Sequence, residues 1–134
     1  MTKSFFYLAL LLLLLFLASC REAPKEDPAL QGPFPGEIQI LNGCGIPKAS
    51  EKIRNLLMEK GFDVIETGNA DSWKYDKTLI VLRKPEWEGT KALQKVLGSD
   101  RVLLLRNPKA LVDVSIYLGK DIEEILAHDN SSQP

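Results

Sequence analysis

Residues 37–61 constrain the fold more than any other stretch, because they predict a strand, a tight turn and a helix in immediate succession. Apolar and polar side chains alternate up to Leu41, as in a half-buried strand. The Asn42–Gly45 run then supplies residues that tolerate a sharp turn. After Pro47, apolar residues recur at helical spacing, and Gly61 ends the pattern. A strand that leads directly into an amphipathic helix is typical of an α/β domain.

Later apolar patterns complete a single domain over residues 37–127. Strands are expected at residues 62–67, 78–82, 102–105 and 113–118, a helix at 86–97, and a short helical end at 122–127. The 78–82 run is apolar throughout, which indicates a central strand covered on both faces. The order β-α-β-β-α-β-β predicts an α/β fold, a small mixed sheet with two packed helices, and leaves the strand neighbours open. Residues 128–134 are expected to be a disordered tail.

Several of these segments resemble the LytR C-terminal domain. The matching segments are Leu41-Asn42-Gly43-Cys44-Gly45, Gly61-Phe62, Gly68-Asn69-Ala70, Thr78 to Leu82, Leu97-Gly98 and Asp113 to Asp121. The resemblance implies a small extracytoplasmic module, often attached to LytR-CpsA-Psr cell-envelope enzymes and also found without them. The chain has no room for the phosphotransferase domain of those enzymes, so the resemblance does not imply their activity.

The first twenty residues predict export. Lys3 precedes an apolar run over residues 5–18, the pattern of a secretory signal. As a helix this run would reach only about 21 Å, short of the ~30 Å hydrocarbon core of a bilayer. Leu17-Ala18-Ser19-Cys20 resembles the lipobox of bacterial lipoproteins, which implies removal of the signal peptide 1–19 and acylation of Cys20 by fatty acids such as palmitate. An ordinary signal peptide with an incidental cysteine is the alternative.

Residues 20–36 are expected to be a lipidated cysteine followed by a flexible, Pro-rich tether. Residues 21–36 hold four prolines and two glycines, with too little apolar surface to offset the cost of ordering. The alternative is that Leu30 or Phe34 packs on the domain. The expected location is the cell membrane or the outer membrane, with the domain held outside the cytoplasm by the lipid.

Charge and cysteine content narrow the possible partners. Removal of residues 1–19 takes Lys3 from the 17 basic side chains and none from the 18 acidic ones, which leaves a formal net charge of −2. This balance does not favour nucleic acid as a partner. Once Cys20 is acylated, Cys44 is the single remaining thiol, so no internal disulfide can form. Cys44 is either a small packed residue at the turn or the link in a thiol-dependent dimer.

The turn after the first strand is one candidate contact site. Asn42, Gly43, Gly45 and Lys48 frame the start of the predicted helix, where backbone amides can hold an anion. A purely structural turn is the alternative. The pattern also lacks the third glycine of a dinucleotide-binding loop.

Trp73 and Tyr75 form a second candidate site, in the loop before the 78–82 strand. Aromatic rings offer an apolar face and a polar edge, which suits stacking on sugars. The alternative is that the two rings cover an edge of the core.

Catalysis has little support in the sequence. His128 is the single histidine, and no metalloprotease, paired-cysteine or nucleophile-elbow pattern is present. We therefore expect no enzyme activity, metal or cofactor. The sequence predicts a membrane-anchored cell-envelope lipoprotein that binds an envelope protein or a cell-wall polymer through one sheet face or the Trp73 loop. The alternative is an enzyme or carrier acting on phosphorylated envelope glycopolymer intermediates at the Asn42–Lys48 turn.

Overall fold

The computed structural model describes residue 7 and residues 32–132. In chain order the elements of the domain are β1 (Phe34–Asn42), α2 (Ala49–Glu59), β2 (Phe62–Asn69), β3 (Leu79–Leu82), α3 (Thr90–Leu97), β4 (Val102–Leu104), β5 (Val114–Leu118) and α4 (Ile122–Ser132). The predicted lipidation site Cys20 lies outside the described residues. The predicted signal peptide, apart from Tyr7, and most of the predicted tether lie outside them too. Among the described residues, no helix has the length and apolar character needed to cross a bilayer.

The five strands form one mixed sheet in the order β2-β1-β5-β3-β4. Strand β1 pairs in parallel with β2 and β5, while β3 pairs in parallel with β4 and antiparallel with β5. The chain thus builds two β-α-β units, and the last strand, β5, is inserted between their first strands. The predicted α/β class and element order are confirmed, and α4 adds a third helix.

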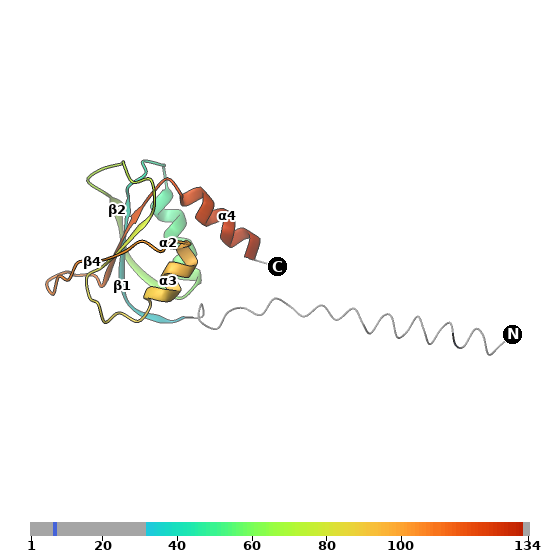
Figure 1. Cartoon of the computed structure of the whole chain (residues 1–134), viewed down its shortest axis with the longest axis horizontal. Coiled ribbons are helices and arrows are strands. Elements are labelled where there is room, and N and C mark those ends of the chain that lie inside the picture. Colours follow the sequence, from blue (N-terminus) through green and yellow to red (C-terminus); the bar gives the residue numbers. More distant parts are fainter. Residues whose placement is uncertain (1–6, 8–31, 133–134) are drawn as a thin grey trace.

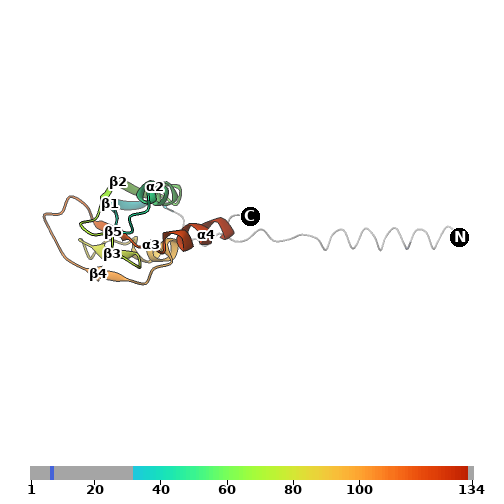
Figure 2. The ribbon, with the colours of Figure 1, turned by 90° about the horizontal axis from the view of Figure 1, so that it is seen from above.

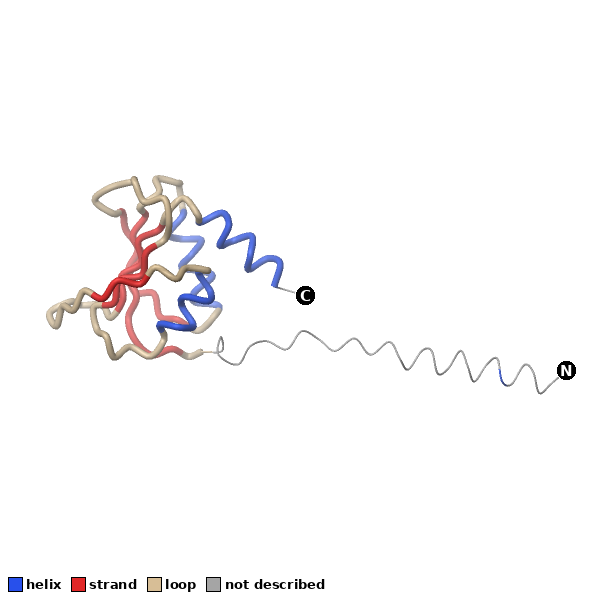
Figure 3. Tube along the Cα trace, viewed as in Figure 1, coloured by secondary structure: helices blue, strands red, loops and turns tan. Residues whose placement is uncertain are grey.

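The helices form one layer and the sheet forms the other. Helices α2, α3 and α4 lie on the same face of the sheet (Figure 1), and the view from above and the tube trace agree (Figures 2 and 3). The core lies between the layers. Ile38 and Ile40 of β1 pair with Val114 and Ile116 of β5, and all four side chains are fully buried in this core. No described helix covers the opposite face, which we call the helix-free face.

Strand β3 was expected to be central and covered on both faces. It is internal, between β5 and β4, and Ile80 and Leu82 belong to the core. Val81 points to the helix-free face and is nevertheless only 3% exposed. The strand is therefore buried on both sides although the described helices cover only one face of the sheet, so its neighbours on the sheet must shield Val81.

Strand β1 begins three residues before the predicted domain boundary, at Phe34. The Phe34 amide donates to the Gly61 carbonyl (2.9 Å), and its ring stacks on Phe62 with the centroids 4.4 Å apart. The predicted tether therefore ends earlier than expected, and the alternative that Phe34 packs on the domain is correct. Stacking on a buried ring removes apolar surface from water, which favours this placement.

Helix α3 begins at Thr90, four residues later than predicted, because the preceding segment folds around Trp87. Trp87 is 8% exposed, and its indole N–H donates to the Pro35 carbonyl (2.7 Å). A Cβ at Gly89 would lie 2.4 Å from the Trp87 ring, so only glycine fits there. Residues Phe34, Phe62 and Trp87 form what we call the buried aromatic cluster, with the Phe62 and Trp87 centroids 6.2 Å apart.

Helix α4 extends to Ser132, whereas a helical end at 127 and a disordered tail beyond it were predicted. Ile122 and Ile125 anchor its first half in the core. The Asp129 carboxylate lies 3.0 Å from the Lys60 ammonium, just after α2. The residues after 127 are therefore helical as far as Ser132, and this ion pair connects them to the rest of the domain.

Candidate functional site

The Asn42 side chain organises the turn that the sequence singled out. Its Oδ1 accepts hydrogen bonds from the amides of Cys44 (3.1 Å) and Gly45 (3.0 Å), and its Nδ2 donates to the Ile46 carbonyl (2.8 Å). An asparagine that bonds the backbone ahead of it fixes a turn locally. The amides of Cys44 and Gly45 are therefore already used within the turn.

The start of α2 carries Lys48 at its N-cap and one amide that is bonded within the turn. Lys48 occupies the N-cap position with φ 60°, and no side chain caps the helix. The Ala49 amide donates back to the Ile46 carbonyl (3.3 Å). Lys48 itself is exposed. The turn thus presents a basic side chain at the surface, beside a helix start whose Ala49 amide is bonded within the turn.

Cys44 faces inward from this turn. It is half-buried and packs against the core, and its Sγ donates to Asn42 Oδ1 (3.3 Å). A thiol held in this way is a packed residue rather than a reactive surface group. This geometry gives no support to a thiol-dependent dimer, which stays a prediction.

The structure brings the two candidate sites together at one end of the sheet. The Tyr75 amide donates to the Gly43 carbonyl (3.1 Å), and the Gly43 amide donates to the Leu118 carbonyl (3.1 Å). A Cβ at Gly43 would lie 2.6 Å from the Tyr75 ring, and one at Gly45 would lie 3.5 Å from Trp73. The Trp73 loop therefore rests on the glycines of the turn.

The aromatic residues of this loop continue onto the helix-free face. Tyr75 stacks on Tyr117 of β5 with centroids 5.4 Å apart and an interplanar angle of 24°. Trp73 is 62% exposed, whereas Tyr75 is half-buried. We call Trp73, Tyr75 and Tyr117 the exposed aromatic cluster. The Tyr75 backbone is bonded to the turn, and the Trp73 ring two residues before it is mostly exposed to solvent.

A chain of polar side chains crosses the helix-free face. Arg83 Nε donates to Ser115 Oγ (3.3 Å), Ser115 Oγ donates to Gln39 Oε1 (3.2 Å), and Gln39 Nε2 donates to Glu66 Oε2 (2.8 Å). The chain begins just after β3 and crosses β5, β1 and β2 in spatial order. We call it the sheet-face network. It connects a guanidinium at one side of the face to a carboxylate at the other.

Arg83 joins this network to the exposed aromatic cluster. Its Nη2 donates to the Tyr117 hydroxyl (3.4 Å), in addition to the bond from Nε to Ser115. A guanidinium has five N–H donors, so among the described residues three are left for a ligand. The helix-free face thus combines stacked rings with donors and acceptors that are held in place.

Sequence reasoning missed the sheet-face network, although part of its signal is visible. Gln39 stands between Ile38 and Ile40, and Ser115 stands between Val114 and Ile116. In a strand, side chains alternate between faces, so these polar positions had to share the face opposite the core. The pairing of Gln39 with Ser115 depends on β5 lying beside β1, which no local pattern reveals.

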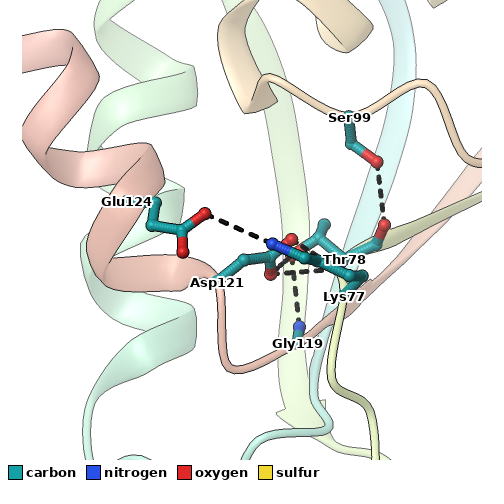
Figure 4. Close-up of polar contacts among 6 residues, drawn as sticks. All are labelled: Lys77, Thr78, Ser99, Gly119, Asp121 and Glu124. Carbon is teal, nitrogen blue, oxygen red and sulfur yellow. Dashed lines mark hydrogen bonds and ion pairs between the residues drawn. The ribbon is translucent and has the colours of Figure 1, made fainter.

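The junction of β3 and α4 is a second polar cluster (Figure 4). The Asp121 carboxylate accepts from the Thr78 amide (3.0 Å) and hydroxyl (2.7 Å), and the Thr78 hydroxyl accepts from the Gly119 amide (3.1 Å). The Ser99 hydroxyl donates to the Thr78 carbonyl (2.8 Å). Each of these groups bonds to another member of the cluster, so we assign it the structural role of holding α4 against β3.

A cavity of about 390 Å³ opens beside this junction. Its apolar wall includes Val96, Leu97 and Ile125, and the ion pair of Lys77 with Glu124 (3.3 Å) lies at its side. No residue predicted from the sequence as a contact site lines it. The cavity is therefore separate from the surface built by the turn, the Trp73 loop and the sheet-face network.

Two aspartates form ion pairs at opposite ends of the sheet. The hydrogen bond from Lys120 (2.8 Å) lowers the pKa of Asp76, which is exposed next to Tyr75. At the other end, Asp113 accepts from the Glu37 amide (2.7 Å) and from Lys84 (2.6 Å). Burial acts to raise the pKa of Asp113, but the hydrogen bonds from Lys84 and from the Glu37 amide outweigh it, and the net pKa is lowered. Within the described residues, no group of three or more His, Cys, Asp or Glu side chains is arranged to hold a metal ion.

The fold and this surface together define a small two-layer α/β module with one face left open by its helices. Residues 37–121 match the model of a family described as the LytR cell envelope-related transcriptional attenuator, and the chain belongs to that family. The resemblance seen in the sequence is thereby confirmed. The family places the chain among cell-envelope-related modules, and this domain is not a known catalytic one. No curated protein and no solved structure matches the chain.

Proposed function

We propose that this chain is a membrane-anchored lipoprotein of the cell envelope, whose module binds a cell-wall polymer or an envelope protein without catalysing a reaction. The binding surface is the exposed aromatic cluster together with the sheet-face network. The observation that carries this proposal is the seating of the Trp73 loop on the glycine turn, with Tyr75 of that loop stacked on Tyr117, whose hydroxyl accepts a hydrogen bond from Arg83.

The chemistry of the surface favours a glycan over a protein surface. An exposed indole gives the flat apolar contact that a sugar ring requires, and Arg83 and Glu66 offer a donor and an acceptor for hydroxyl groups. Binding sites of this kind combine aromatic contacts with a few placed polar groups. We therefore take a cell-wall polymer as the first ligand to test.

Binding is tested by cosedimentation of the full chain, in detergent, with isolated cell-wall material. We expect Trp73→Ala to weaken retention about tenfold, because hot-spot aromatic residues contribute this much to binding. The matched control is Met58→Ala, which removes a 49% exposed side chain from α2 on the other layer. Equal retention of the natural chain, Trp73→Ala and Met58→Ala would contradict the proposal.

A protein ligand would give a different result in the same design. A photo-crosslinking residue in place of Trp73 would then capture one envelope protein in cells, and wall material would not retain the chain. Capture at position 58 serves as the control. This outcome would support the same binding surface, with an envelope protein and not a cell-wall polymer as its ligand.

Anchoring is proposed to depend on Cys20, which the lipobox resemblance selects. A mature chain with more than one acyl group would be stably held at a membrane, as multiple chains are needed for firm attachment. We expect Cys20→Ala to abolish incorporation of a palmitate analogue and to leave the signal peptide uncleaved. Unchanged labelling of the variant would exclude this site.

The alternative prediction, action on phosphorylated glycopolymer intermediates at the Asn42–Lys48 turn, has no specific observation in its favour. The amides of Cys44 and Gly45 already donate to Asn42, so an anion held by these two amides would have to displace that side chain. Calorimetric titration with a polyprenyl phosphate headgroup mimic tests it directly. Heat of binding that is lost in Lys48→Ala would revive this alternative.

A further inference from the structure

The last residue of β4 and the connection from β4 to β5 expose aliphatic side chains at one end of the sheet. Leu104, Leu105 and Leu111 are 57%, 52% and 85% exposed. We call residues 104–111 the leucine loop. Single exposed leucines are common on soluble proteins, but several on one short segment mark a contact surface.

Backbone hydrogen bonds define the conformation of the leucine loop. The Leu105 amide donates to the Leu82 carbonyl (3.0 Å) and the Asn107 amide to the Arg83 carbonyl (3.0 Å), which holds the first half against β3. The Ala110 amide donates to the Asn107 carbonyl (3.0 Å) and closes a turn. After the loop, Val112 is buried. The leucines are therefore held outward by a backbone that is bonded at both ends.

The charge of this loop is entirely positive. Residues 104–112 include Arg106 and Lys109 and no acidic residue, and both basic side chains are exposed. Leucine beside arginine and lysine is the composition that settles at the interface of an anionic bilayer, where the apolar side chains enter the acyl boundary and the cations meet the headgroups.

The loop also lies at the end of the sheet where the chain enters the domain. The Asp113 amide, just after the loop, donates to the Glu37 carbonyl near the start of β1 (2.9 Å). The turn and the Trp73 loop lie at the other end of β1, and Figure 1 shows the two loops at different ends of the sheet. From Cys20, the thirteen residues before Phe34 reach at most about 45 Å. An anchored chain would thus hold this end of the domain close to the lipid.

We propose that the leucine loop docks on the anionic surface of the membrane that carries the chain. The inference rests on the proposed anchoring, which brings the loop to the lipid. Docking would place the exposed aromatic cluster at the far end of the sheet, away from the bilayer and towards the wall. The module would then be oriented and not merely tethered.

The test uses the full chain in vesicles with brominated lipids, so that its attachment does not depend on the loop. Leu111→Trp adds a reporter at the loop, and Met58→Trp adds a matched one on α2; the quenching of Trp73 and Trp87 measured in the natural chain is subtracted from both. With brominated phosphatidylglycerol, we expect several-fold stronger quenching of the reporter at 111 than of the one at 58. Arg106→Ser with Lys109→Ser should remove most of this difference, while Lys52→Ser with Lys91→Ser, which removes two exposed charges from the helices, should not.

Three results would overturn the docking proposal. One is equal quenching of the two reporters on vesicles that hold the chain. Another is quenching at 111 that is the same with brominated phosphatidylcholine alone and survives loss of both charges. The third is a change in emission at 111 that depends on chain concentration without vesicles, which would identify a second copy as the occupant. Failure of anchoring is read separately, from palmitate labelling of Cys20→Ala.

Discussion

The two aromatic clusters of this domain are similar in composition and differ in exposure to solvent. Phe34, Phe62 and Trp87 fill the end of the sheet where β1 begins, and the Trp87 indole N–H is satisfied by a backbone carbonyl. At the end of β1, Trp73 is 62% exposed above a glycine turn. Both tryptophans lie in connecting segments outside strands and helices. The comparison shows that the surroundings, and not the residue type or the local sequence, decide whether a tryptophan side chain is buried or exposed.

The largest expected effect separates the two tryptophans directly. Trp87→Ala should lower the free energy of unfolding by about 3–5 kcal/mol, because it empties a buried site and removes a hydrogen bond. Trp73→Ala should change it by no more than about 0.5 kcal/mol, as for other exposed substitutions. Urea denaturation of both variants measures the difference. Similar losses of unfolding free energy in the two variants would contradict the distinction between a stabilising Trp87 and an exposed Trp73.

Each cluster also rests on a glycine, and the two glycines should respond differently. A Cβ at Gly36 would lie 2.4 Å from the buried Trp87 indole, and Gly36 has φ 124°, so Gly36→Ala should cost about 2–4 kcal/mol. At Gly43 the Cβ would lie 2.6 Å from the Tyr75 ring and 2.8 Å from the Leu118 carbonyl oxygen, but Gly43 does not have a positive φ, so Gly43→Ala should cost about 1–3 kcal/mol.

Thermal unfolding of the two glycine variants provides the measurement. Gly68→Ala is the control, because its Cβ would find only an ordinary contact with Leu41 at 3.5 Å. Gly43→Ala should also weaken wall binding through displacement of the Trp73 loop. A Gly43→Ala chain that loses more stability than Gly36→Ala would show that the exposed cluster is the more tightly packed one.

A smaller effect on stability should distinguish Asp113 from Asp76, which lie at opposite ends of the sheet. The side chain of Asp113 is 14% exposed and accepts a backbone amide, so Asp113→Asn should cost about 1 kcal/mol near neutral pH. Asp76 is 78% exposed, and Asp76→Asn should make no measurable difference.

The dependence on pH has a definite sign. Because folding lowers the pKa of Asp113, its contribution is complete above the unfolded pKa of about 4 and is lost as the pH falls through the folded value. The stability gap between the natural chain and Asp113→Asn should therefore close in acid. A gap that widens below pH 4 would contradict this assignment, and urea titrations at several pH values would reveal it.

The smallest expected effect concerns the lysine beside the exposed cluster. Lys48 has φ 60°, a conformation that costs L-residues energy and glycine none, so Lys48→Gly should stabilise the domain by about 0.5–1 kcal/mol. Lys52→Gly within α2 is the control and should destabilise by about 1 kcal/mol. Loss of stability in Lys48→Gly would mean that the lysine side chain makes a stabilising contact at the turn.

Much of the candidate surface could be predicted from the sequence, but only as two separate segments. The glycine turn and the Trp73 loop each had a local signal, namely backbone freedom and aromatic residues in a connector. Their contact through Gly43 and Tyr75 joins residues more than thirty positions apart. Loop closure of this kind is decided by the packing of the strands below, so local pattern could propose both segments without placing them together.

Other features had a misleading local signal. Trp87 lies in a segment that resembles the start of a helix, and its burial follows from the nearby Pro35 and Phe62. The residues after Ala127 are polar and resemble a tail, yet Asp129 reaches Lys60 at the end of another helix. In both cases a distant partner overrides the local preference, which is weak by comparison.

The sequence by itself determined the elements, the face of each strand that enters the core, and the family, because periodicity and turn residues act within a few positions of the chain. Only the tertiary structure decided that β5 lies between β1 and β3, which aligns Gln39 with Ser115 and Arg83 across the helix-free face. It also decided which tryptophan is buried. These outcomes depend on the fit of all helices to one side of the sheet, and that fit is a property of the packed core as a whole.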